Sequence, residues 1–162
     1  MPFYEILKKI GIKENHKKIE IEYKKNSIKN KKEIKIYSKI KNFFLYLHKN
    51  KIDYYIVTSK DLERTKKFLY HYKIFPKSIH SPSKKYKGKP NPDLLDHCIK
   101  INKINKNKCC YVGDTEIDYI AAKSANIDFI FANYGYGKVK TKYNFVIQNP
   151  KELFLYLDHN SK

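Results

Sequence analysis

The chain has 162 residues, of which 35 are Lys or Arg and 16 are Asp or Glu, so its formal charge is +19. Hydrophobic residues make up 41% and aromatic residues 15%, which argues against a disordered chain. The length predicts one domain with a buried core, and no apolar run approaches the ~18 residues that cross a bilayer. The sequence shows no signal-peptide pattern at its start, and its three cysteines are too few for a disulfide framework. We therefore expect a soluble cytoplasmic domain with no membrane partner.

The positive charge does not predict a specific nucleic-acid partner. Arg64 is the only arginine among the 35 basic residues, whereas proteins that read phosphates and bases usually recruit arginine. Lysine is abundant together with Ile, Asn and Tyr, which is typical of a codon bias towards A and T. The charge nevertheless favours weak, salt-dependent attraction to polyanions.

Hydrophobic periodicity predicts helices and short strands in alternation. The helical pattern occurs at 3–10, 39–49, 61–71, 92–103 and 116–125, and a capping pattern starts a last helix at Asn149. Short apolar runs predict buried strands at 53–58, 109–113, 128–132 and 144–147, and Ile79 lies in a short strand or loop. Residues 13–35 are interpreted as a helix, although Ile19, Ile21 and Tyr23 also alternate like a strand. The order predicts a parallel α/β sheet with helices on both faces.

In such a sheet, ligands bind at the carboxyl ends of the strands, so the residues that follow each strand are the candidates. Thr58 and Ser59 follow strand 53–58, where a hydroxyl group and a helix N-terminus can hold a phosphate oxygen. Ser59 also fits the simpler role of a helix cap. Lys89 lies in a loop stiffened by two prolines, which either aims its ammonium at a phosphate or carboxylate or only shapes the loop.

Two carboxylates follow strand 109–113. Asp114 lies directly beyond the strand, and Asp118 lies one helical turn later, facing the same place. Paired carboxylates at a strand end suit Mg²⁺, which takes oxygen ligands. Thr115 and Asp118 also fit a capping box, and both roles can coexist. The glycines of segment 133–137 either allow a tight turn beside a ligand or form an ordinary loop.

These segments resemble motifs II, III and IV of the haloacid dehalogenase (HAD) superfamily, and most closely its phosphoglycolate phosphatase group. The chain reads IVTSK, KPNPDLL and VGDTEIDYIAA, where that group reads IVT-x-K, KP-x-PD-x-L and VGD-T-x-x-D-x-x-A-A. The resemblance covers residues 37–158. It implies a Rossmann-like HAD core at 36–162 after the truncated remnant of a helical cap at 1–35. It also implies Mg²⁺-dependent hydrolysis of a small phosphorylated metabolite through an aspartyl-phosphate.

The resemblance implies a role for each candidate residue. Asp114 would bind Mg²⁺, and Asp118 would support the metal from behind. Lys89 would neutralise the phosphoryl charge and hold the nucleophile. Thr58 would hydrogen-bond the phosphoryl group, helped by the backbone N–H of Ser59. Thr58 and Lys89 are thus the catalytic candidates, and Thr58, Ser59 and Lys89 are the phosphate-binding ones.

Motif I of the family is a DxD sequence that supplies the nucleophile and the general acid/base, and no DxD occurs in this chain. The resemblance places the motif I strand at the centre of the sheet, between the strands that carry motifs II and IV. We therefore expect these two strands to close against each other or to accept a replacement, because unpaired backbone groups are costly. The replacement would be residues 18–24 or a segment from another chain, so a homo-oligomer or a complementing segment is an expected partner.

Three functions follow from these patterns. The first is a HAD-type phosphohydrolase that takes its nucleophile from elsewhere, which leaves open whether the chain alone is an enzyme. The second is a phosphate- and Mg²⁺-binding remnant without turnover. The third is a lysine-rich, non-specific polyanion binder.

Overall fold

A computed structural model of the chain describes residues 7–8, 10–29, 34–138 and 142–160. The chain folds as two compact units, Met1–Tyr37 and Ser38–Lys162. The predicted helix at 3–10 lies largely outside the described residues.

The main element of the first unit is the helix α2 (His16–Lys29). Residues four apart share a helix face, and one such pair forms an ion pair of 2.6 Å between Lys24 and Glu20. The helix predicted within 13–35 is confirmed. The alternative that residues 18–24 form a replacement strand is wrong, because these residues lie inside α2.

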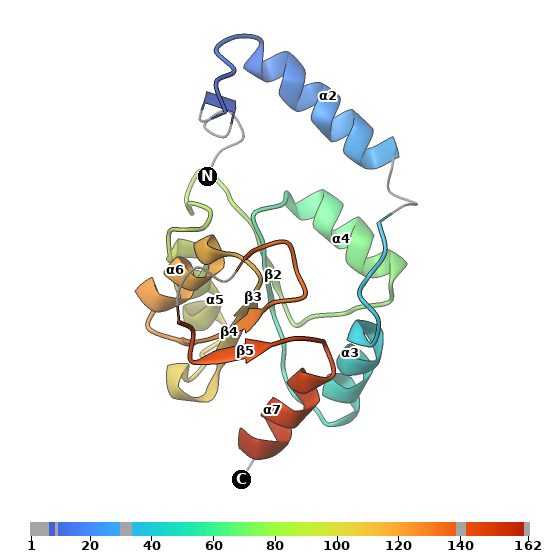
Figure 1. Cartoon of the computed structure of the whole chain (residues 1–162), viewed down its shortest axis with the longest axis vertical. Coiled ribbons are helices and arrows are strands. Elements are labelled where there is room, and N and C mark those ends of the chain that lie inside the picture. Colours follow the sequence, from blue (N-terminus) through green and yellow to red (C-terminus); the bar gives the residue numbers. More distant parts are fainter. Residues whose placement is uncertain (1–6, 9, 30–33, 139–141, 161–162) are drawn as a thin grey trace. The chain divides into compact units, whose positions relative to one another are not determined.

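The second unit alternates helices and short strands (Figure 1). Its elements are α3 (Ile40–Lys49), β1 (Ile56–Val57), α4 (Leu62–His71), β2 (Ile79–His80), α5 (Asp93–Ile101), the 3-10 turn η2 (Lys106–Lys108), β3 (Cys110–Gly113), α6 (Glu116–Ser124), β4 (Asp128–Ala132), β5 (Phe145–Ile147) and α7 (Glu152–Asn160). The strand pairs β1–β2, β3–β4 and β4–β5 are all parallel, which confirms the predicted fold class. No helix in the described ranges is both long enough and apolar enough to cross a membrane.

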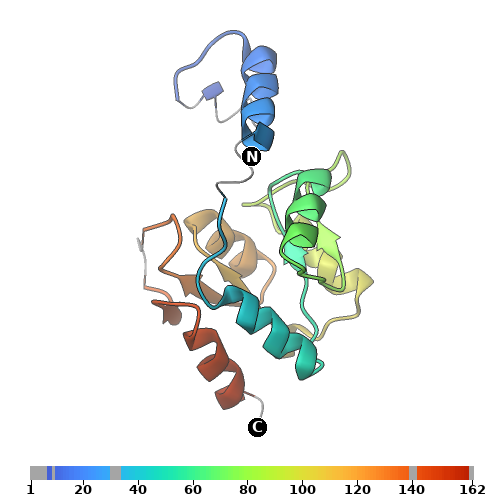
Figure 2. The same cartoon turned by 90° about the vertical axis from the view of Figure 1, so that its right-hand side faces the viewer.

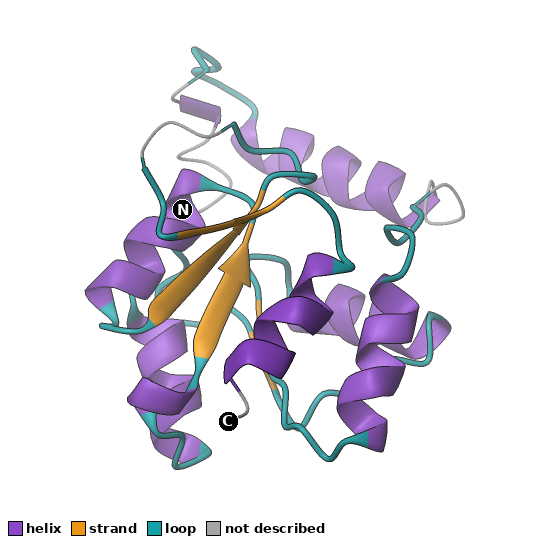
Figure 3. Cartoon of the chain, turned by 60° about the horizontal axis from the view of Figure 1, so that its bottom comes forward, coloured by secondary structure: helices purple, strands orange, loops and turns teal. Residues whose placement is uncertain are grey.

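Strand β4 shows why helices cover both faces of the sheet. Successive side chains of a strand point to opposite faces. Phe129 and Phe131 pack into a core with side chains of α5 and α6, whereas Ile130 and Ala132 pack with side chains of α3 and α7. Figure 3 shows the strands of this unit between helices, and Figure 2 shows α3 and α7 side by side. Both faces of β4 are therefore buried, as expected for a parallel sheet.

Within the part of the chain that the structure describes, the strands form two sheets instead of one. Strands β1 and β2 form the first, and β3, β4 and β5 form the second. Val57 of β1 packs against the core that α5, α6 and β4 share, so both sheets belong to one layered unit. The carbonyl oxygen of Val57 accepts hydrogen bonds from the Tyr111 hydroxyl at 3.1 Å and from Lys89 Nζ at 3.5 Å.

The two-sheet arrangement tests what was expected of β1 and β3, the strands that precede motifs II and IV. Within the described residues, β1 and β3 share no backbone ladder, so the expectation that they close against each other is wrong. The side chains of Tyr111 and Lys89 donate hydrogen bonds to the Val57 carbonyl group instead. Complementation by a segment from another chain remains a prediction.

Candidate functional site

The centre of the candidate site is a buried ion pair between Lys89 and Asp118. Lys89 Nζ lies 2.5 Å from Asp118 Oδ1, and the two side chains are only 12% and 7% exposed. The Tyr111 hydroxyl lies 2.7 Å from Lys89 Nζ and 3.3 Å from the same Asp118 oxygen. Lys89 and Asp118 are 29 positions apart, so the fold brings together two of the residues that the sequence nominated.

The neighbours of this pair determine its charge states. Burial opposes the charged form of Asp118, but the Lys89 ammonium and hydrogen bonds from Lys89 and Thr115 prevail and lower the pKa of this carboxyl. Burial also opposes the charged form of Lys89, yet its contacts with Tyr111 and Asp118 raise the pKa of this ammonium. Burial raises the pKa of Tyr111 to about 12. At neutral pH the cluster therefore holds a cation, an anion and a neutral hydroxyl group.

Asp118 also starts helix α6. Its Oδ2 accepts hydrogen bonds from the backbone N–H of Thr115 at 3.1 Å and from the Thr115 hydroxyl at 2.6 Å. The backbone N–H of Asp118 donates back to the Thr115 hydroxyl oxygen, which completes the predicted capping box. The capping interpretation of Asp118 is thus confirmed, and the same residue also pairs with Lys89.

Thr58 and Ser59 lie where β1 ends. The Thr58 N–H donates to the His80 carbonyl of β2 at 3.0 Å, and the Thr58 hydroxyl oxygen accepts from the N–H of Lys60 at 3.1 Å. Thr58 directly follows Val57, whose carbonyl Lys89 contacts, so Thr58 and Lys89 lie at the same strand end. Ser59 is exposed and does not cap α4, because Asp61 accepts from the Arg64 N–H and fills that role. This leaves the Ser59 hydroxyl at the strand end.

Asp114 lies at the end of β3 against the segment that follows β4. Its Oδ2 accepts a hydrogen bond of 2.8 Å from the backbone N–H of Tyr136. A Cβ atom on Gly135 would overlap the Asp114 side chain, and one on Gly137 would overlap the Asp114 carbonyl group. The two glycines therefore allow a close backbone approach that no other residue permits at these positions. The glycines thus form a close turn against Asp114, and the expectation that a ligand lies beside this turn remains a prediction.

The two carboxylates are not equivalent as ligands for the Mg²⁺ that the family implies. Both oxygens of Asp118 already accept hydrogen bonds from protein donors, which leaves them poorly suited to bind a metal ion directly. The expected role of Asp118 behind the metal remains a prediction. Asp114 has one carboxylate oxygen occupied by a single backbone N–H. Among the described residues, no group of three or more His, Cys, Asp or Glu is placed to hold a metal ion. The residues therefore fit a Mg²⁺ that one carboxylate, a phosphate and water molecules coordinate, which is a usual mode for this ion.

Sequence reasoning missed Tyr111. A tyrosine in a short apolar strand is typical of core packing, and Tyr111 does pack against Phe129 with ring centroids 6.2 Å apart. Its hydroxyl group nevertheless contacts Lys89, Asp118 and the Val57 carbonyl. The sequence feature that could have identified Tyr111 is its position two residues before Gly113, on the strand that leads into the candidate site.

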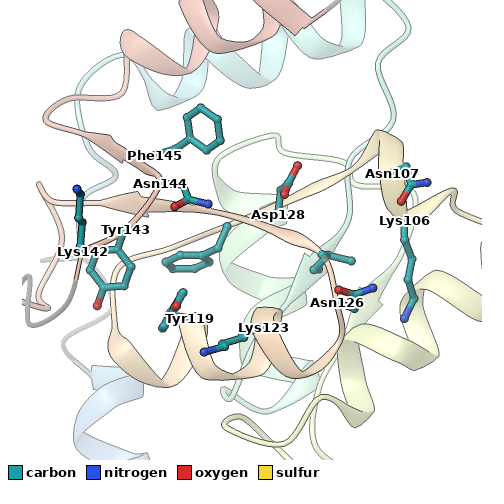
Figure 4. A pocket seen from close by; sticks show the side chains of 12 residues that line it. Lys106, Asn107, Tyr119, Lys123, Asn126, Asp128, Lys142, Tyr143, Asn144 and Phe145 are labelled. Carbon is teal, nitrogen blue, oxygen red and sulfur yellow. The ribbon is translucent and has the colours of Figure 1, made fainter.

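A separate cavity of about 440 Å³ lies away from these residues. Three lysines and three asparagines line it together with aromatic side chains, as can be followed in Figure 4. The cavity lies where β4 and β5 begin, and its lining includes Asp128, Phe129, Asn144 and Phe145. The candidate site follows the opposite, carboxyl ends of the strands, so this cavity is not part of it.

The sequence matches the family model described as haloacid dehalogenase-like hydrolase over residues 1–132. A phosphoglycolate phosphatase from Colwellia psychrerythraea is 40% identical over 48 residues. That match covers 30% of this chain and 21% of the relative, so the chain spans about a fifth of the curated protein that it matches.

Solved structures share the fold over nearly the whole chain. A protein from Lactobacillus plantarum, provisionally described as a phosphoglycolate phosphatase, has a TM-score of 0.85 at 20% identity, covering 96% of this chain and 77% of that one. A HAD-superfamily hydrolase from Ehrlichia chaffeensis has a TM-score of 0.68 at 17% identity, covering 99% of this chain and 87% of that one. With the family model matching most of its sequence and these structures sharing its parallel α/β fold, the chain belongs to the haloacid dehalogenase-like hydrolase family.

Proposed function

We propose that this chain handles the phosphoryl group and the magnesium ion of a HAD-type phosphohydrolase that acts on a small phosphorylated metabolite. The observation that carries the proposal is the buried Lys89 ammonium, which contacts Asp118 and Tyr111. It also contacts the Val57 carbonyl at the end of β1, directly before Thr58 and Ser59. A cation fixed in this way neutralises phosphoryl charge without having to reorganise.

Each remaining residue has a defined task in this proposal. The Thr58 hydroxyl and the Ser59 N–H donate hydrogen bonds to phosphoryl oxygens. Lys89 supplies the positive charge, and Asp118 keeps Lys89 oriented and charged. Asp114 would hold Mg²⁺, which when bound neutralises and positions the phosphoryl group. These are the positioning and electrostatic contributions that dominate phosphoryl transfer.

The attacking carboxylate is the component that these residues do not supply, since the sequence contains no DxD. This observation favours a second candidate function for the chain by itself, namely binding of phosphate and Mg²⁺ without turnover. Loss of a covalent nucleophile typically costs many powers of ten in rate. The two candidates share the binding step and differ only in hydrolysis.

Hydrolysis of p-nitrophenyl phosphate with Mg²⁺ separates the two candidates. We compare the chain with its Asp114→Asn and Lys89→Met variants and measure phosphate binding in parallel by titration calorimetry. Turnover that both variants lose supports the phosphohydrolase. Phosphate binding that both variants weaken, without turnover in any of the three proteins, supports the binding remnant. Phosphate binding that neither variant changes would refute the site itself.

A further inference from the structure

Tyr136 combines high exposure with a fixed position. Tyr136 is 92% exposed, while its backbone N–H donates to Asp114 Oδ2 at 2.8 Å. The preceding residue is anchored as well, because the Gly135 N–H donates to the Ala132 carbonyl of β4 at 3.0 Å. An aromatic side chain in solvent thus starts from a backbone that is held against the candidate metal ligand.

The glycines on either side of Tyr136 hold the backbone against Asp114. Gly135 and Gly137 both lie so close to Asp114 that neither position has room for a Cβ atom. The high exposure of Tyr136 places its side chain in solvent beside this contact. Single exposed apolar residues are common on protein surfaces. Tyr136 differs from them because its backbone is held beside Asp114.

We propose that Tyr136 determines ligand preference by packing its ring against the organic group of a phosphate ester, and that the chain favours esters with a planar or aromatic group. This inference rests on the proposed function, because it places the phosphate between Asp114 and Lys89. In this proposal the ester group of such a phosphate extends into solvent beside the segment that carries Tyr136, whose backbone is held against Asp114. Tyrosine suits this contact because its ring offers a large rigid face at low conformational cost.

Phenyl phosphate and methyl phosphate provide matched probes, since they carry the same phosphate and differ only in the ester group. Binding is measured by titration calorimetry with Mg²⁺ for the natural chain and for Tyr136→Ala and Tyr136→Phe. We expect the natural chain to bind phenyl phosphate about three- to tenfold more tightly than methyl phosphate. Tyr136→Ala removes this preference, and Tyr136→Phe keeps it because the ring remains. The hydrogen bond to Asp114 comes from the backbone, so both variants retain it.

Tyr70→Ala is the control, because Tyr70 is also strongly exposed, at 77%, but lies on α4. It should leave the preference unchanged. If both esters bind and Tyr136→Ala keeps the full preference, the inference is wrong while the proposed function stands. If neither ester binds to the natural chain, or if Lys89→Met leaves binding of both esters unchanged, the proposed function fails and the inference fails with it.

Discussion

The Lys89–Asp118 pair is buried, and burial determines what its removal costs. A charge that loses its partner in the interior keeps its desolvation penalty, whereas an exposed charge returns to water. The chain contains a suitable comparison in the pair between Lys106 and Asp96, which spans 3.2 Å with side chains 40% and 48% exposed.

Asp118→Asn should lower the free energy of unfolding by about 3–5 kcal/mol, because it leaves the Lys89 ammonium buried without a counter-charge. Asp96→Asn, which breaks the exposed pair, should lower it by at most about 1 kcal/mol. Urea unfolding at neutral pH measures both values. Equal effects of the two substitutions would show that the Lys89–Asp118 pair is not buried in solution.

The same pair predicts a pH dependence. The pKa of Asp118 is lowered by folding, so its stabilisation is fully present above the unfolded value of ~3.9 and is lost as the pH falls through the folded value. The pKa of Lys89 is raised, so its contribution is present below ~10.4 and is lost as the pH rises through its folded value. The stability difference between the natural chain and Asp118→Asn should therefore be constant near neutrality and shrink below about pH 4. A difference that grows on acidification would contradict this assignment.

At the scale of elements, strand β3 is less covered than its neighbour β4. Val112 in β3 is 38% exposed, whereas Ile130 and Phe131 in β4 are fully buried. β3 pairs with β4, and the Tyr111 hydroxyl of β3 donates a hydrogen bond to the Val57 carbonyl of β1. The Tyr111 hydroxyl is therefore a link between the two sheets.

Tyr111→Phe should lower the free energy of unfolding by about 1–3 kcal/mol, because it leaves the ring in place but removes a hydroxyl group that contacts the Val57 carbonyl, Lys89 and Asp118. Tyr143→Phe is the matched control, since Tyr143 is also buried but its hydroxyl has no hydrogen-bond partner among the described residues. That substitution should be neutral or stabilising. Thermal unfolding of both variants tests the comparison, and a larger loss for Tyr143→Phe would refute the role of Tyr111.

At the scale of the whole molecule, the charge of +19 determines how the chain meets polyanions. Attraction through many dispersed lysines falls steeply with salt and does not depend on any single side chain. Elution from heparin at increasing salt should therefore occur at moderate concentration. Lys89→Met should elute like the natural chain, because it removes one buried cation out of 35 basic residues. Earlier elution of this variant would indicate that polyanions bind at the phosphate site.

The sequence predicted most helices and strands but fewer of the strand pairings and side-chain contacts between them. Periodicity located the helices and strands of the second unit, but only Ile56 and Val57 of the predicted strand 53–58 pair, because their partner β2 is two residues long. Motif positions nominated Lys89 and Asp118 without indicating that they contact each other, since spacing along a chain carries no distance across a fold. The Tyr111 hydroxyl was missed because apolar surroundings make a strand tyrosine look like core.

The double use of Asp118 affects how this gene tolerates mutation. One oxygen of its carboxylate serves the first turn of α6, and the other serves Lys89. Selection for a folded product therefore preserves this position even in a lineage that has abandoned phosphate chemistry. Retention of Asp118 among descendants is consequently no sign of retained catalysis. Drift at Tyr136, whose side chain has no comparable duty in the interior, would reveal relaxed selection on ligand choice much earlier.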